Sequence, residues 1–167
     1  FLFSLSTIDM IILTCPEKKV IDYVKDTWGD KISTIQRPEN LAYINSPLEP
    51  VLEHALANTT INRDYDFFMI SSIELPFKKA KIMESGANIM KIFDVDTVVG
   101  VRPEEDLLLK HNGKGMQFLS KQGQFRLERN ELFKMVPGYL IRDYNSFLSS
   151  RKLFGNTIGH VMFDELS

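Results

Sequence analysis

The sequence contains one cysteine, Cys15, among its 167 residues. A single cysteine excludes an internal disulfide and a cysteine-rich metal site, and the absence of disulfides is typical of a cytoplasmic protein. The apolar run before Cys15 predicts a buried side chain, not a nucleophile. No stretch approaches the roughly 20 apolar residues that cross a bilayer. The formal net charge is only −2, so nothing favours broad capture of nucleic acid or an anionic membrane.

The chain has the composition of a folded domain: 44% of its residues are hydrophobic and 25% are charged. It contains no internal repeat, low-complexity tract or clear linker, so residues 1–167 are expected to form a single domain. Runs typical of strands alternate with helical patterns, which favours an α/β layered fold with a largely parallel sheet. Strands are expected over 8–14, 32–36, 66–73, 97–101, 138–141 and 158–163, and helices after Pro16, after Ser46, over 78–93 and over 144–152.

One helix start has a specific local pattern. Ser46 is followed by Pro47 and, three residues after the serine, by Glu49. This spacing predicts a capping box, in which the two side chains satisfy backbone amides at the first turn.

Several short segments occur in an order that resembles one enzyme family. They are Arg37-Pro38-Glu39-Asn40-Leu41-Ala42 with the following helix ending His54-Ala55-Leu56, then 94–101, 138–141 and 155–164. Together they resemble the acylneuraminate cytidylyltransferases, which make CMP-activated acidic sugars from CTP. The resemblance covers most of residues 8–167 and implies a three-layer α/β/α Rossmann-like nucleotidyltransferase fold with a mostly parallel, mixed sheet. It also implies a homodimer, since 102–130 resembles the family's protruding dimerisation arm.

The chain departs from the family pattern at several places. The family's phosphate-binding strand and loop would precede Phe1, and its Asp-x-Asp metal pair would follow Ser167. The complete enzyme is therefore expected to need Mg²⁺, with ligands outside this chain, and this chain alone is not expected to turn over CTP. Leu48 replaces the family's base-contacting serine and Pro137 replaces an asparagine. These replacements keep open the alternative of a non-catalytic relative with a sugar-binding or assembly role.

The resemblance and the order of elements nominate four site residues, and no catalytic residue. Arg37 and Ser72 are expected to bind the nucleotide, because both follow predicted strands, where doubly wound sheets place their ligands. Glu74 and Arg129 are expected to bind the sugar, Arg129 through its carboxylate. The alternatives are a surface arginine at 37, a helix cap at 72 and 74, and a surface hairpin or dimer contact at 129.

Asp94 and Asp96 offer a different hypothesis. A pair of aspartates at this spacing is used by glycosyltransferases to hold a metal ion. Here the pair precedes a predicted strand, at the end opposite the expected active edge. A role in capping the loop and the strand is therefore the preferred interpretation, and no metal ligand is assigned.

Overall fold

The computed structural model describes residues 2–43, 45–60, 65–73, 79–104, 106–119 and 132–164. Its helices are α1 (Lys18–Trp28), α2 (Leu48–Ala57), α3 (Ala80–Phe93) and α4 (Tyr144–Ser150), with short 3-10 helices at Leu2–Ser4, Gly29–Lys31 and Glu39–Leu41. The strands are β1 (Ile12–Cys15), β2 (Ser33–Gln36), β3 (Phe67–Ser71), β4 (Thr97–Glu104), β5 (Leu109–His111), β6 (Met116–Phe118), β7 (Leu132–Asp143) and β8 (Ile158–Met162). Strands and helices alternate as predicted, except in the run from β4 to β7.

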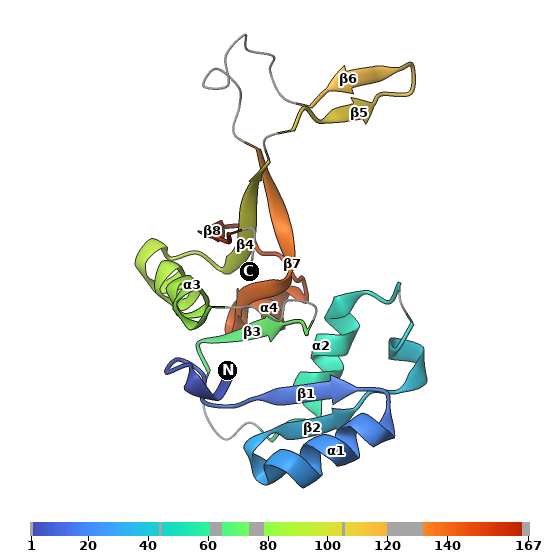
Figure 1. Ribbon diagram of the computed structural model, residues 1–167, viewed down its shortest axis with the longest axis vertical. Coiled ribbons are helices and arrows are strands. Elements are labelled where there is room, and N and C mark those ends of the chain that lie inside the picture. Colours follow the sequence, from blue (N-terminus) through green and yellow to red (C-terminus); the bar gives the residue numbers. More distant parts are fainter. Residues whose placement is uncertain are drawn as a thin grey trace.

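The described strands form separate sheets. A four-stranded sheet has the order β3-β7-β4-β8, in which β7 is antiparallel to β3 and β4 while β8 is parallel to β4. β1 and β2 form a parallel pair beside it, and β5 and β6 form an antiparallel hairpin. In Figure 1, β1, β2 and β3 run in the same direction, so the architecture is the mixed, mostly parallel one that was expected.

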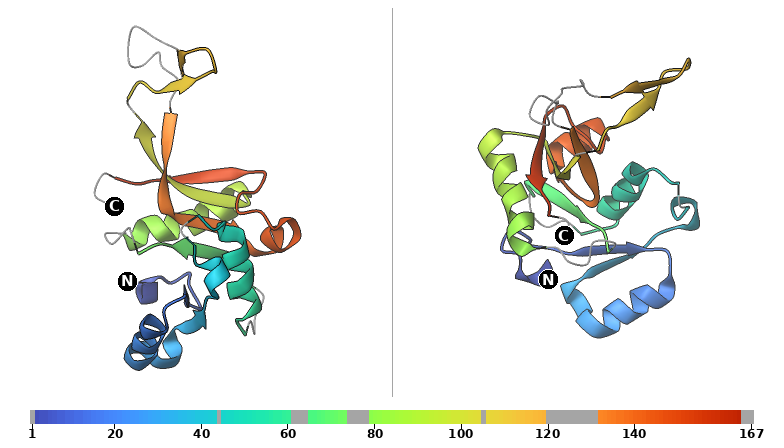
Figure 2. Two further views of the ribbon diagram at one scale, coloured as in Figure 1. Left: turned by 90° about the vertical axis from the view of Figure 1, so that its right-hand side faces the viewer. Right: turned by 45° about the horizontal axis from the view of Figure 1, so that its top comes forward.

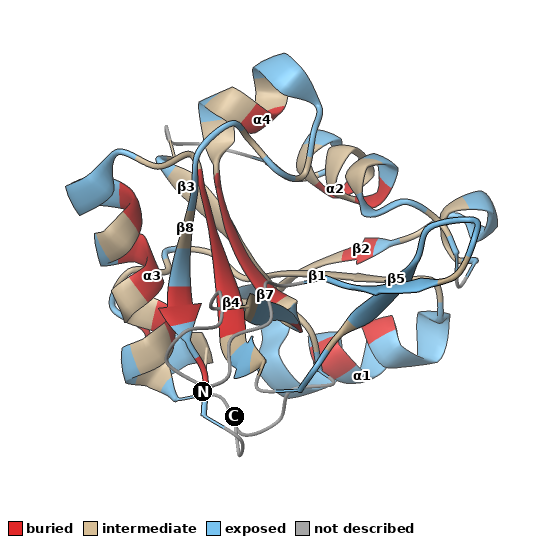
Figure 3. Cartoon of the chain, turned by 90° about the horizontal axis from the view of Figure 1, so that it is seen from above, coloured by how far each residue is buried: buried red, intermediate tan, exposed pale blue. Residues whose placement is uncertain are grey.

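Helices cover both faces of the four-stranded sheet. On one face, Met83, Ala87 and Met90 of α3 pack in a buried cluster with Val98 and Ile141 of the strands. The neighbouring residues Val99 and Leu140 belong to a second cluster, because successive strand residues point to opposite faces. On that second face the ring of Phe68 packs edge-on against Phe147 of α4, with centroids 5.1 Å apart. Figure 3 shows the buried stripe of α3 turned toward β4 and β7.

A glycine lets α3 approach the sheet closely. A Cβ atom added at Gly86 would lie 1.9 Å from the Tyr139 hydroxyl oxygen. That hydroxyl donates a hydrogen bond to the Met83 carbonyl at 3.2 Å, and burial raises the pKa of Tyr139 well above its ordinary value. Gly86 and Tyr139 therefore set the distance between α3 and β7: the glycine leaves room for the Tyr139 ring, and the Tyr139 hydroxyl bonds to the helix.

The predicted capping box is wrong. α2 begins at Leu48, its N-cap position is Pro47, and no side chain caps it. The Ser46 amide instead donates to the Tyr43 carbonyl at 2.9 Å, so the serine belongs to the preceding turn. By contrast, α1 ends at Gly29 as predicted, with a φ of 55° that suits glycine and an amide bonded to the Lys25 carbonyl.

A long arm leaves the body of the molecule. β4 and β7 extend further than the predicted 97–101 and 138–141, and they stay paired out to Glu104 and Leu132. The β5–β6 hairpin lies at the far end of this arm (Figure 1 and the left view of Figure 2). The distal half of β7 is mostly exposed, and β4 loses its buried, β-branched character after Val101, so burial does not mark these parts as strands. The excursion predicted after Arg102 is thus confirmed over the described residues.

Candidate functional site

Arg37 lies directly after β2 and reaches back across β1. Its amide donates to the Cys15 carbonyl at 2.9 Å, which continues the parallel ladder by one residue. Its Nη2 donates to the Thr14 carbonyl at 3.0 Å. The Nε of Arg37 and the Oγ1 of Thr14 are buried and have no partner within the described structure. Leaving a buried donor unpaired costs about 1–3 kcal/mol, so an acceptor on a bound ligand would stabilise this arrangement.

Ser72 follows β3, where the chain presses against β7. The Ser72 amide donates to the Gly138 carbonyl at 2.9 Å. A Cβ atom at Gly138 would lie 2.4 Å from the Cβ of Ser72, and the φ of Gly138 is +83°. Only glycine fits here, because both the backbone conformation and the space exclude a side chain. Two segments that the resemblance singled out separately, at 72 and at 138, therefore meet.

Arg37 and Ser72 share one edge of the molecule. Arg37 follows β2, Ser72 follows β3, and both strands run the same way in Figure 1. Both residues consequently lie where strands end, which is the side at which open α/β sheets bind ligands. The other nominated residues, Glu74 and Arg129, lie outside the described residues and have no placement.

Asp94 and Asp96 lie at the opposite edge. Asp94 caps the end of α3 and Asp96 caps the loop beside β4, which agrees with the interpretation preferred from the sequence. Asp94 ends α3 in a left-handed conformation with a φ of 50°. Asp96 accepts hydrogen bonds from the Asn156 amide at 2.9 Å, the Thr157 amide at 3.3 Å and the Thr97 hydroxyl at 3.1 Å. Both aspartates are thus accounted for by the loop and the strand that they flank.

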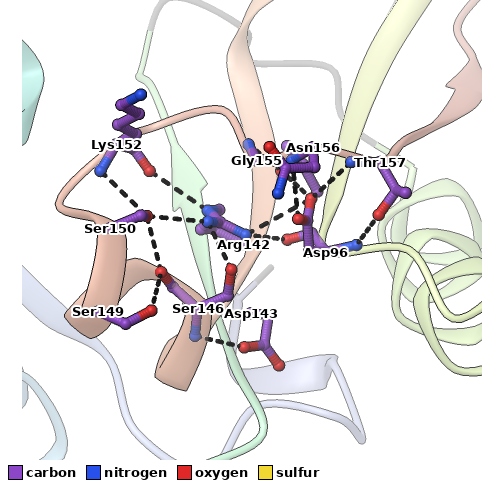
Figure 4. A network of polar contacts seen from close by, with 11 residues as sticks. Asp96, Arg142, Asp143, Ser146, Ser149, Ser150, Lys152, Gly155, Asn156 and Thr157 are labelled. Carbon is purple, nitrogen blue, oxygen red and sulfur yellow. Dashed lines mark hydrogen bonds and ion pairs between the residues drawn. The ribbon is translucent and has the colours of Figure 1, made fainter.

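The residue at the centre of this edge is Arg142, which no sequence motif had singled out. Its guanidinium is fully buried and donates to the Asp96 carbonyl at 2.7 Å, the Ser146 hydroxyl at 2.8 Å and, at 3.3 Å each, the Lys152 carbonyl and the Ser150 hydroxyl. Figure 4 shows these contacts converging from Asp96, which precedes β4, from α4 and from the loop after α4. Burial raises the pKa of Asp96, but hydrogen bonds from Asn156, Thr97 and Thr157 and the charge of Arg142 together lower that pKa below its ordinary value.

Within the stretches that the structure describes, no three His, Cys, Asp or Glu side chains come together as a metal site would require. Leu48, which replaces the expected base-contacting serine, is the first residue of α2 and is 38% exposed. Its apolar side chain offers no hydrogen bond to a base.

Comparison with known proteins shows the fold. No protein-family model and no curated protein matches the chain. Among solved structures, the 4-diphosphocytidyl-2C-methyl-D-erythritol synthase of Anaerococcus prevotii is similar with a TM-score of 0.64 and 12% identity, over 99% of this chain and 74% of that one. The bifunctional IspDF of Campylobacter jejuni is similar with a TM-score of 0.61 and 16% identity, over 99% of this chain and 40% of that one. The chain shares the fold of these proteins. Identities this low establish no more than that.

Proposed function

We propose that the protein is a cytidylyltransferase that activates an acidic or related sugar with CTP, giving a CMP-sugar and pyrophosphate for surface polysaccharide synthesis. The observation that carries the proposal is Arg37, whose buried Nε has no partner among the described residues and which lies at the edge where the strands end. The fold supports it, because one protein with this fold is a synthase of a diphosphocytidyl compound. The reaction itself needs positive charge and backbone donors around a phosphate, which a guanidinium at this edge can supply in part.

Roles follow from the chemistry of each side chain. Arg37 and Ser72 bind the nucleotide: the planar guanidinium offers donors to phosphate or cytosine oxygens, and the hydroxyl donates or accepts. Glu74 orients a sugar hydroxyl and Arg129 pairs with the carboxylate of an acidic sugar. Mg²⁺ would neutralise charge on the phosphates in the complete enzyme.

CTP binding tests the nucleotide assignment. Equilibrium dialysis of the purified chain against labelled CTP, UTP, ATP and GTP is expected to show preferential retention of CTP. The preference should weaken in Arg37→Ala but not in Arg151→Ala, which removes a half-exposed arginine from the other edge. Equal retention of all four nucleotides, or equal loss in the two variants, would overturn the assignment of Arg37.

The acceptor is tested separately, with the full-length native protein, CTP and Mg²⁺. Pyrophosphate release is expected with a sugar that carries a carboxylate. Pyrophosphate release with a phosphorylated sugar alcohol alone would support cytidylyl transfer and would refute an acidic sugar as the acceptor. A phosphorylated sugar alcohol is included as an acceptor because one of the similar structures is named for a methylerythritol product.

A non-catalytic relative is the second candidate. Two observations favour it: Leu48 is apolar where a base contact was expected, and Pro137 is exposed and has no amide to donate. Sugar binding without CTP binding or pyrophosphate release would support this candidate over the enzyme.

We also propose a homodimer held by the arm, located in the cytoplasm. In the β5–β6 hairpin, Leu109 is paired with Phe118 and His111 with Met116, so these four side chains share one face. Leu109, Phe118 and Met116 are 48%, 41% and 63% exposed. A two-stranded hairpin with an open apolar face is marginally stable alone and gains from a partner surface. No helix within the described residues is long and apolar enough to cross a membrane.

A further inference from the structure

The turn of the β5–β6 hairpin contains the pair Asn112-Gly113, and no other asparagine in the sequence is followed by glycine. Both residues are exposed, and the Asn112 amide closes the turn by donating to the Gly115 carbonyl at 3.0 Å. The hairpin lies at the far end of the arm (Figure 1). In such a pair the glycine nitrogen can attack the asparagine side-chain amide, because glycine has no Cβ atom to hinder the approach.

His111 lies beside the nitrogen that would attack. The Gly113 amide donates a hydrogen bond to Nδ1 of His111 at 3.1 Å. Because Nδ1 accepts this bond, the imidazole is in its neutral form, with its proton on Nε2. A neutral imidazole within hydrogen-bond reach of the proton to be removed has the geometry of a general base.

The same turn polarises the side-chain carbonyl of Asn112. Its Oδ1 accepts from the Lys114 amide at 2.9 Å and from the Gly115 amide at 3.0 Å. Two backbone donors aimed at one oxygen stabilise the negative charge that develops on it when the carbonyl carbon is attacked. The ring closed by the Lys114 bond also contains Asn112 Cγ and the Gly113 nitrogen, so the turn keeps the two reacting atoms close to each other.

The nitrogen that would leave is held as well. Nδ2 of Asn112 donates to Oε1 of Gln117 at 3.0 Å. This bond fixes which way the side-chain amide faces, so that Oδ1 and not Nδ2 meets the two backbone donors. One exposed turn therefore brings together a nucleophile, a base, a polarised carbonyl and an oriented leaving group.

We propose that Asn112 is a self-modification site, at which the folded chain converts this asparagine to aspartate and isoaspartate. The Gly113 nitrogen bonds to Asn112 Cγ while its proton passes to His111 Nδ1. The Cγ–Nδ2 bond then breaks, the imidazolium gives the proton to Nδ2, and ammonia leaves behind a cyclic imide. Water opens the imide at either carbonyl, with no oxidation or reduction. The site shares no residue with the edge that holds Arg37 and Ser72, so the proposal does not depend on CTP binding.

The modification changes the backbone of the turn. In isoaspartate the main chain runs through the former side chain and is longer by one carbon atom. The bond from the Asn112 amide to the Gly115 carbonyl closes a short turn, which cannot take up the extra atom without moving. Since a two-stranded hairpin is marginally stable by itself, the conversion is expected to loosen the pairing of β5 with β6.

Peptide mapping measures the modification in the folded chain. The purified protein is kept at neutral pH and physiological temperature and is digested at intervals. Mass spectrometry then gives the acid fraction at each asparagine, and electron-transfer fragmentation separates isoaspartate from aspartate. Asn112 is expected to convert, with isoaspartate among its products. Asn145 is the internal control and should not change, because it is exposed but the amide of the next residue, Ser146, is bonded to Asp143 at 2.7 Å.

Two results of the mapping would overturn the proposal. An Asn112 that stays unchanged would show that the hydrogen bonds of the turn protect it. Conversion to aspartate without isoaspartate would show direct hydrolysis, since opening of the imide gives both products.

The role of His111 is tested by His111→Phe, which keeps a ring on the hairpin and removes Nδ1. Conversion in the folded protein is expected to slow by about tenfold or more, because a general base contributes at least this much. His111→Thr, which retains an acceptor but no base, should slow it in the same way. Lys110→Ala, on the other face of β5, is the control and should leave the rate unchanged.

Urea separates the effect of the turn from the effect of the local sequence. In the unfolded chain, the wild type and His111→Phe are expected to convert at similar rates, because the bond from Gly113 to His111 is lost in both. A difference that persists in urea would assign the effect to the sequence and overturn the proposal. Equal rates of the wild type and both His111 variants in the folded state would also overturn it.

Discussion

Nη1 of the fully buried Arg142 lies 3.6 Å from Oδ1 of Asp96, and the same nitrogen donates to the Asp96 backbone carbonyl at 2.7 Å. The guanidinium therefore ties the start of β4 to the end of β7 and to α4. Arg142→Ala should lower the free energy of unfolding by about 3–5 kcal/mol, because it removes the positive charge beside a partly buried carboxylate and the side-chain donor to the Asp96 and Lys152 carbonyls. Urea denaturation measures this loss. Arg151→Ala is the matched control: its Nε lies 3.9 Å from Glu53 in an exposed pair, worth at most about 1 kcal/mol. Equal losses in the two variants would contradict the structural role of Arg142.

The same contact makes stability depend on pH in the acid range. The pKa of Asp96 is lowered in the folded protein relative to its ordinary value of 3.8. A carboxyl whose folded pKa is lowered contributes its stability above the unfolded pKa and loses it as pH falls through the folded pKa. The difference in unfolding free energy between the wild type and Asp96→Asn should therefore be constant from neutral pH down to about pH 5 and shrink below about pH 4. Urea denaturation in a series of acidic buffers tests this. A difference that grows on acidification would reverse the assigned sign.

Gly138 allows a contact that no other residue permits. Its φ is +83° and an added Cβ would overlap the Cβ of Ser72 at 2.4 Å. Gly138→Ala should therefore destabilise the protein by more than about 1 kcal/mol. Gly115→Ala is the control, because its Cβ would meet nothing within 4 Å. In the double variant Gly138→Ala/Ser72→Gly, the overlap disappears while the backbone strain stays, so part of the lost stability should return. Additive effects of the two changes would show that the two positions do not touch.

Arg37 is tested most directly by a conservative change. Lysine keeps the charge of Arg37 but cannot offer both the donor to Thr14 and the spare Nε donor. Arg37→Lys is expected to weaken CTP binding by about tenfold, which corresponds to about 1.4 kcal/mol for one charged hydrogen bond. Isothermal titration of CTP measures it, with thermal unfolding to show that the variant stays folded. Arg151→Lys should leave the affinity unchanged. If Arg37→Lys binds CTP like the wild type, the guanidinium contributes only its charge, or nothing, to the site.

Local patterns predicted most of the fold because they report local physics. Met83, Ala87 and Met90 recur at helical spacing, and α3 buries these three residues together with Gly86. Gly29 ends α1 because a positive φ is available to it. The edge that holds Arg37 and Ser72 followed from the order of strands and helices. Ser46 failed as a cap although its spacing was right, because α2 begins only at Leu48 and the Ser46 amide belongs to the preceding turn.

Other features depend on residues far apart in the chain, and no local pattern encodes them. Arg142 follows two apolar residues and its sequence neighbours do not reveal the carbonyls of Asp96 and Lys152 that it bonds. The contact between Gly138 of β7 and Ser72, which follows β3, joins two segments that are more than 60 residues apart in the sequence. The distal halves of β4 and β7 pair far out along the arm, where Phe133 and Met135 of β7 are exposed, so an expectation built on buried apolar runs ended the predicted strands too early.

The arm provides the last prediction. If its apolar face is buried between two copies, a charge placed at the centre of that face should separate them, because burying an unpaired ammonium is costly. Met116 is 63% exposed and lies on this face, which makes Met116→Lys the test. Sedimentation should give twice the chain mass for the wild type and the chain mass for the variant. Tyr23→Lys, at a position on α1 that is 64% exposed, is the control and should remain dimeric. A wild type that sediments as a monomer would refute the dimer. If both variants sediment as dimers, the dimer interface does not include this face of β5 and β6.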